Sequence, residues 1–234
     1  MYHSGFALLG EGWTVIFDYY EDSAAGNEGV LHRELLERPG CFYVLASHAH
    51  ADHFNRQVLA WREKRPDIVY LFSTDICVGE MRQEKGIHWL AQGETWQDRL
   101  LRVKAFGSTD VGVSFLVEVE GRRIFHAGDL NNWHWMEESD EAEWKGYERH
   151  FQHELAILAA EVPCLDVAVF ISCIFLLPKV LNAQFVEQIK TTIFVPMHFD
   201  EAYQAAAAFR PTAQACGAES LLLEHRGQRV NLFE

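Results

Sequence analysis

The sequence of 234 residues lacks paired cysteines, an excess of positive charge and a long apolar run. Five cysteines with no Cys-x-x-Cys spacing argue against a disulfide framework and against a cysteine-rich structural zinc site. A nucleic-acid partner usually needs a basic surface, so the net charge of −14 counts against DNA or RNA. The longest apolar candidate, Val167–Leu177, is shorter than the roughly 18 residues of a membrane span. Met1–Phe6 does not resemble a signal peptide, so we expect a cytoplasmic protein without a membrane partner.

Hydrophobic residues make up 49% of the chain, enough for a sizeable core. Alternating apolar residues, apolar runs and turn residues predict strands at 5–9, 14–19, 41–46, 68–72, 100–106, 113–119, 123–126, 165–171, 192–196, 221–223 and 229–232. Helical periodicity predicts helices at 31–38, 54–64, 137–162, 182–190 and 200–210. The sequence contains no internal repeat and no low-complexity linker. The order of elements predicts one α/β domain over residues 1–234, with two packed sheets and helices outside them.

Four side chains that bind metals occur within six residues, directly after the apolar strand 41–46. They are His48, His50, Asp52 and His53. At a strand end the chain leaves the sheet, so these side chains can converge on one point. Imidazole and carboxylate are ligands for zinc and also suit iron and manganese. A His-rich surface loop is the alternative, but four ligands at this spacing favour a metal site.

The His-x-His-x-Asp-His segment resembles the hallmark of the metallo-β-lactamase superfamily. Four further segments resemble its other motifs in the same order along nearly the whole chain. They are the opening pair Tyr2-His3-Ser4-Gly5 and Ile16-Phe17-Asp18, then His126-Ala127-Gly128-Asp129, then Pro196-Met197-His198-Phe199. The resemblance implies a four-layered αβ/βα sandwich, with metals held at one edge between the sheets.

The resemblance also implies roles for individual residues. His48 and His50 would bind a first metal, Asp52, His53 and His198 a second, and Asp129 would bridge the two. A metal-bound hydroxide would be the nucleophile, with Asp52 and Asp129 as the catalytic carboxylates around that water. We expect one or two Zn²⁺ ions, with Mn²⁺ or Fe²⁺ as alternatives.

One departure from the family pattern concerns the first metal. The family usually supplies a further histidine from the loop that here reads Gly107-Ser108-Thr109-Asp110, and Ser108 stands where that ligand would be. His88 is too early in the sequence and beside a predicted helix. Either Asp110 replaces the missing ligand, or the first site is weak or empty. His3 is a further candidate near the site, and His126 is either a support for a ligand or a core histidine.

The chain most resembles the small single-domain hydrolases that include ascorbate-6-phosphate lactonase. This implies a small-molecule substrate with a lactone or other ester-like bond, with a phosphorylated substrate as one option. Two alternatives stay open. One is phosphodiester cleavage, and the other is a non-catalytic metal-binding or ligand-sensing protein with a degenerate first site. The sequence leaves the oligomeric state open.

Overall fold

A computed structural model describes residues 1–26, 28–133, 140–172 and 178–233. The chain divides into two compact units, Met1–Ala91 with Glu224–Glu234, and Gln92–Leu223. Each unit contains one of the two β-sheets and its own helices, so the mixed α/β class predicted from the sequence is confirmed. The prediction of a single domain stays a prediction.

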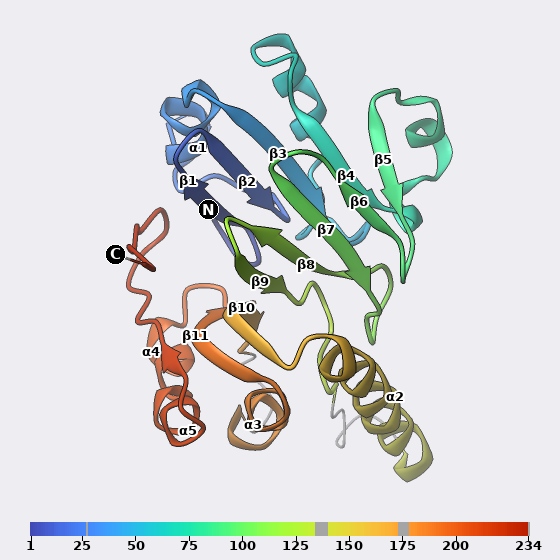
Figure 1. The fold of residues 1–234 in the computed structure, drawn as a ribbon, viewed down its shortest axis with the longest axis vertical. Coiled ribbons are helices and arrows are strands. Elements are labelled where there is room, and N and C mark those ends of the chain that lie inside the picture. The colour runs from blue at the N-terminus through green and yellow to red at the C-terminus, as the bar shows by residue number, and fades with distance from the viewer. Residues whose placement is uncertain (27, 134–139, 173–177, 234) are drawn as a thin grey trace. The chain divides into compact units, whose positions relative to one another are not determined.

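The first unit is built on a five-stranded sheet in the order β1-β2-β3-β4-β5 (Figure 1). Its strands are β1 (Phe6–Gly10), β2 (Trp13–Phe17), β3 (Cys41–Ala46), β4 (Val69–Ser73) and β5 (Ile87–Leu90). The pair β1–β2 is an antiparallel hairpin, and β2 to β5 run parallel. The parallel strands therefore end at one edge of the sheet, and the chain leaves that edge after β2, β3 and β4.

Short helices pack on this sheet. They are α1 (Val30–Arg33) and the 3₁₀ segments η1 (Leu35–Glu37), η2 (Arg56–Glu63), η3 (Thr74–Ile76) and η4 (Gly79–Gln83). A core cluster joins them to the sheet through side chains such as Leu31, Trp61 and Phe72. The α-helix predicted at 54–64 is wrong in type, because this segment forms 3₁₀ turns that start at the capping side chain of Asn55.

The second unit contains a seven-stranded sheet in the order β12-β11-β10-β9-β8-β7-β6. Its strands are β6 (Thr95–Gln97), β7 (Leu101–Phe106), β8 (Ser114–Val119), β9 (Arg122–His126), β10 (Cys164–Ile171), β11 (Lys190–Met197) and β12 (Glu219–Ser220). Strands β6 to β9 form an antiparallel meander, whereas β9 to β12 are parallel. The loops after β9, β10 and β11 therefore leave from the same edge.

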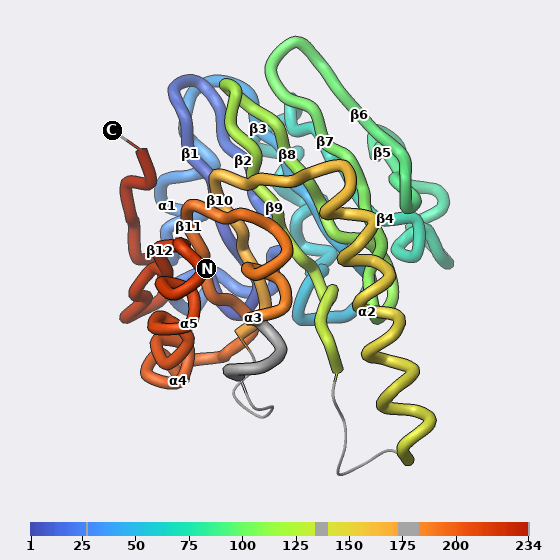
Figure 2. The backbone as a smooth tube through the Cα atoms, turned by 60° about the horizontal axis from the view of Figure 1, so that its bottom comes forward, coloured from blue at the N-terminus to red at the C-terminus, as the bar shows by residue number. Residues whose placement is uncertain are grey.

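Helices connect the parallel strands of the second unit (Figure 2). They are α2 (Glu141–Glu161), α3 (Pro178–Gln188), α4 (Tyr203–Ala207) and α5 (Arg210–Ala215). Helix α2 buries Phe151, Leu155 and Leu158, whereas Tyr147 is exposed. A capping box at Asp140 fixes the start of α2, and the predicted start at 137 lies outside the described residues.

Several predicted boundaries are wrong. The helix predicted to begin at 182 begins at Pro178, and the helix predicted at 200–210 is two short helices. Pro211 lies in the first turn of α5 instead of ending a helix, because a proline there gives up no intrahelical hydrogen bond. The strands β5 and β6 were not predicted, and the segments 221–223 and 229–232 are not strands.

The sequence predicts neither a disulfide framework nor a membrane span, and the described residues bear on both predictions. Cys41, Cys77, Cys164 and Cys216 are free thiols, and the fifth cysteine lies outside the described residues. Among the helices that the structure describes, none is long and apolar enough to cross a membrane.

Candidate metal centre

Strand ends of the first unit carry the His-rich motif. β2 and β3 are parallel neighbours, and their last paired residues are Phe17 and Leu45. Asp18 therefore leaves the sheet beside the segment 46–53, and its backbone N–H donates to the carbonyl of Leu45 at 2.9 Å. The backbone N–H of Ala49 donates to Asp75, which follows β4, at 2.8 Å. Contacts to both neighbouring strand ends thus fix the loop between His48 and His53.

Asp18 is the centre of a buried hydrogen-bond network. Its carboxylate accepts the backbone N–H of Ser47 at 2.7 Å, the Ser47 hydroxyl at 2.6 Å and His53 Nδ1 at 2.8 Å. Because a carboxylate only accepts, His53 carries its proton on Nδ1 and presents a lone pair on Nε2. The side chains of Asp18 and His53 are both fully buried, so this tautomer is firmly held.

The same network sets the tautomer of His48. The Ser47 hydroxyl has one hydrogen, which it donates to Asp18. The Ser47 oxygen therefore accepts a hydrogen bond from the Nδ1–H group of His48 at 2.9 Å. His48 therefore also presents its Nε2 lone pair, which lies 3.1 Å from Nδ1 of His50. One carboxylate thus orients two histidines of the motif, as outer hydrogen bonds do around protein-bound metals.

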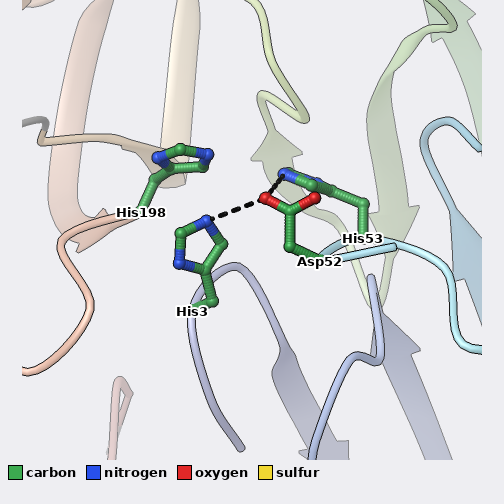
Figure 3. Close-up of side chains that lie close together, drawn as sticks. All are labelled: His3, Asp52, His53 and His198. Carbon is green, nitrogen blue, oxygen red and sulfur yellow. Dashed lines mark ion pairs between the residues drawn. The ribbon is translucent and has the colours of Figure 1, made fainter. Parts of the chain in front are cut away.

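His3, Asp52 and His53 form a second group of donors within the first unit. Asp52 Oδ2 lies 3.2 Å from His3 Nε2 and 3.8 Å from His53 Nε2 (Figure 3). The hydrogen bond from His3, helped by the nearby His53, holds the pKa of Asp52 far below its usual range despite partial burial. Asp52 is therefore a carboxylate at neutral pH, which is the form that binds a cation.

Strand ends of the second unit carry the other predicted ligands. Asp129 follows β9 and His198 follows β11, and Asp129 Oδ1 lies 3.7 Å from His198 Nε2. His126 is fully buried, and its Nδ1 accepts the backbone N–H of Gly128 at 3.2 Å. His126 therefore supports the turn that leads to Asp129, which agrees with a supporting role.

The loop after β7 brings Asp110 to Asp129. Carboxylate oxygens of these two residues lie within 4.8 Å of each other. Ser108 is buried, and its hydroxyl oxygen accepts the backbone N–H of Asp110 at 3.3 Å. Ser108 thus supports the backbone of the loop, and Asp110 supplies a donor atom near Asp129. His88 lies on β5, which follows the short 3₁₀ segment η4.

These separations match what one ion demands of its ligands. Nitrogen and oxygen ligands lie about 2.0–2.2 Å from a zinc ion, so two ligands of one ion are at most about 4.4 Å apart. The pairs His3–Asp52, Asp52–His53, His48–His50 and Asp129–His198 all meet this limit. The two donor atoms of each of these pairs are therefore close enough to share one divalent ion.

Three residues of these groups adopt a left-handed backbone conformation. They are His3, Asp18 and His198, with φ of 56°, 41° and 60°. Such a conformation costs about 1–3 kcal/mol for a residue other than glycine and persists where the surroundings enforce it. Backbone strain therefore coincides with one supporting residue and two donor residues of these groups.

The sequence interpretation assigned no role to Asp18 or Ser47. A weak signal exists, because an aspartate follows the buried apolar strand that ends with Ile16 and Phe17. Their contact depends on the register of β2 against β3, which joins residues distant in the sequence.

Known structures resemble the whole chain, although no family model and no curated protein matches its sequence. Igni18, a metallo hydrolase from Ignicoccus hospitalis, is 15% identical at a TM-score of 0.68, over 96% of this chain and 93% of that chain. The metallo-β-lactamase fold protein YhfI from Bacillus subtilis is 7% identical at a TM-score of 0.60, over 96% and 90%. CmlA, a diiron β-hydroxylase from Streptomyces venezuelae, is 14% identical at a TM-score of 0.65, over 96% and 52%.

These similarities establish the fold. The two sheets and their helices, together with the likeness to those structures over nearly the whole chain, identify the metallo-β-lactamase fold. The fold class expected from the sequence resemblance is therefore confirmed.

Proposed function

We propose that this protein is a metal-dependent hydrolase that cleaves a lactone or another ester-like bond of a small molecule. The observation that carries the proposal is the Asp18–Ser47 network, which holds His48 and His53 with their Nε2 lone pairs presented. A buried carboxylate that orients two histidines is typical of the hydrogen bonds that support metal ligands, and a solvent-exposed loop does not require one. The likeness to a metallo hydrolase of the same fold supports the same conclusion.

The proposed ligands are those that the sequence motifs suggest, with two additions. As the sequence resemblance implies, His48 and His50 would hold a first ion, Asp52, His53 and His198 would hold a second, and Asp129 would contribute to both; Asp110 is added to the first set. His3 joins the second set, because its Nε2 lies 3.2 Å from Asp52. Asp110 takes the place of the histidine that Ser108 replaces, because its carboxylate lies near that of Asp129.

Bound divalent ions in such a site lower the pKa of a bound water toward neutrality and polarise the substrate oxygen that they contact. The residues of the chain do the rest. In this proposal, Asp52 and Asp129 would orient the attacking water and accept its proton. The buried Asp18 keeps His48 and His53 in the ligand tautomer throughout.

Zinc is the proposed metal, because imidazole and carboxylate are its usual ligands. Iron and manganese accept the same donors. Iron enters the tests because CmlA, a protein of similar fold, is a diiron enzyme.

The first experiment measures metal content per chain by elemental analysis of wild type and of an Asp110→Ala variant. We expect two ions in wild type and one in the variant. Asp67→Ala is the matched control, because Asp67 is an exposed carboxylate outside the ligand set. No metal in wild type, even after reconstitution, would contradict the proposal. One ion in both proteins would contradict the role of Asp110.

The second experiment tests catalysis on a panel of lactones, thioesters and phosphodiesters, phosphorylated and not, with added zinc, manganese or iron. Turnover of a lactone or ester that Asp52→Asn abolishes supports the proposal. Turnover restricted to phosphodiesters identifies the alternative activity. A filled site that is silent on every substrate favours a ligand-sensing protein and contradicts hydrolysis.

A further inference from the structure

Two loops of the second unit carry carboxylates, and one buried side chain joins them. Asp110 lies on the loop after β7, and Asp129 on the loop after β9. Thr109 lies between them and is only 7% exposed. The strands that lead to the loops are not neighbours, because β8 separates β7 from β9. The separation of the two carboxylates therefore depends on contacts between the loops themselves.

The hydroxyl of Thr109 makes the contact with backbone atoms of the second loop. It donates to the carbonyl of Asn131 at 2.5 Å and accepts the backbone N–H of the same residue at 2.8 Å. The carbonyl of Asp129 is a second, longer acceptor at 3.2 Å. A hydroxyl has one hydrogen, so the short bond to Asn131 is the main donor interaction. The side chain of Thr109 thus links the two loops, whose strands β7 and β9 are not hydrogen-bonded to each other.

This contact bears directly on the carboxylates. Thr109 precedes Asp110 by one residue, and its acceptor atoms belong to Asp129 and to Asn131 two residues later. A shift of either loop would therefore change the carboxylate separation, which lies within 4.8 Å. The other end of the first loop is held separately, because the Ser114 hydroxyl donates to the carbonyl of Gly107 at 3.0 Å.

We propose that Thr109 is a positioning residue that holds Asp110 and Asp129 at the separation required for a shared metal ion. This inference rests on the proposed function, in which both carboxylates are ligands of the first ion. Thr109 itself is not a ligand.

Thr109→Val tests the inference, because valine keeps the shape of threonine and removes the hydroxyl. Hydrogen bonds that orient ligands typically change metal affinity about 10- to 100-fold. We expect such a loss for Zn²⁺ and Mn²⁺ in competition titrations with a chromophoric chelator. Thr109→Ser should restore the wild-type affinity, because it keeps the hydroxyl. Thr109→Ala gives the same test if the valine variant does not fold.

Thr191→Val is the matched control. Thr191 is 2% exposed, and its hydroxyl donates to the carbonyl of Ile189 at 3.0 Å in the same unit, at the start of β11. Thermal unfolding with excess chelator should show similar losses for both valine variants. Only Thr109→Val should lose part of the stabilisation that added metal confers. A merely structural role would weaken the apo-protein and leave metal affinity unchanged.

The outcomes separate this inference from the proposed function. Wild-type protein that binds no metal overturns both. Wild type that binds metal, with Asp110→Ala weakened and Thr109→Val unchanged, overturns the inference alone. A Thr109→Ser variant whose metal affinity is as low as that of Thr109→Val also overturns the inference, because the hydroxyl would then have no part in positioning.

Discussion

Replacing Asp18 by asparagine should weaken metal binding without unfolding the protein. The carboxylate of Asp18 accepts two bonds from Ser47 and one from His53, and all three groups are buried. Asparagine has nearly the same shape, but one of its two acceptor oxygens becomes an NH₂ group. The variant therefore tests hydrogen-bond polarity separately from packing.

The new amide has two orientations, and each has a cost. If its NH₂ faces His53, it donates to Nδ1, and the histidine proton moves to Nε2, where it blocks ligation. If its NH₂ faces the backbone N–H of Ser47, two donors oppose each other, which costs about 1–3 kcal/mol for a buried group. Loss of a ligand's outer hydrogen bond typically weakens metal binding about 10- to 100-fold, or about 1.4–2.7 kcal/mol.

The assay is a competition titration for Zn²⁺, together with denaturant unfolding of the metal-free protein. We expect the metal dissociation constant of Asp18→Asn to rise by that factor, and the unfolding free energy to fall by about 1–3 kcal/mol. Asp22→Asn is the control, because Asp22 is also a buried carboxylate that accepts several N–H groups, at the start of α1. Wild-type affinity in Asp18→Asn, or an equal loss in Asp22→Asn, would refute the reasoning.

The same Asp22→Asn variant should flatten the acid limb of the stability curve. Burial raises the pKa of Asp22, but hydrogen bonds from His32 and from backbone N–H groups outweigh burial and lower it below 3.8. Wild type then loses this stabilisation as the pH falls from 3.8 through the lowered pKa, whereas the variant should not, in urea unfolding followed against pH. Gly107→Ala should lower the melting temperature by an amount equivalent to about 1–3 kcal/mol, because the added Cβ would lie 2.0 Å from buried Glu154 Oε2. Gly146→Ala should raise the melting temperature by an amount equivalent to about 0.5–1 kcal/mol. The added Cβ on α2 would lie 3.9 Å from Arg149, which is an ordinary contact, and alanine favours the helix. Equal effects of the two alanines would contradict the packing argument.

Elements of the fold could be predicted from the sequence where a run of apolar residues indicates a buried strand or helix. The strand 41–46 was predicted with its observed bounds, because five of its six residues are buried and apolar. The strands β5 and β6 were missed because they are short and partly exposed, so their pattern carries little signal. The helix predicted to begin at 182 begins at Pro178, because the apolar periodicity does not mark its first turn.

For the candidate site, the sequence reveals the type of the donor residues and does not reveal the contacts that support them. Donor residues are recognisable in the sequence because few side chains bind metals, and the motif places four of them together. The support of those donors is not recognisable, because it depends on strand register. Asp18 meets Ser47 only because Phe17 pairs with Leu45 in neighbouring parallel strands.

Parallel strands explain why these donors gather after strands in both units. In the first unit, Asp18 follows β2 and the histidine motif follows β3, its parallel neighbour. In the second, Asp129 follows β9 and His198 follows β11, with β10 parallel between them. Loops at the carboxyl edge of parallel strands are where α/β folds place their sites. The edge brings Asp129 Oδ1 to 3.7 Å from His198 Nε2, although the helices α2 and α3 and the strands β10 and β11 separate the two residues in the sequence. A substitution that shifts the register at this edge should therefore disturb several donors together, whereas one on the antiparallel strands β7 and β8 should disturb only Asp110, on the loop between them.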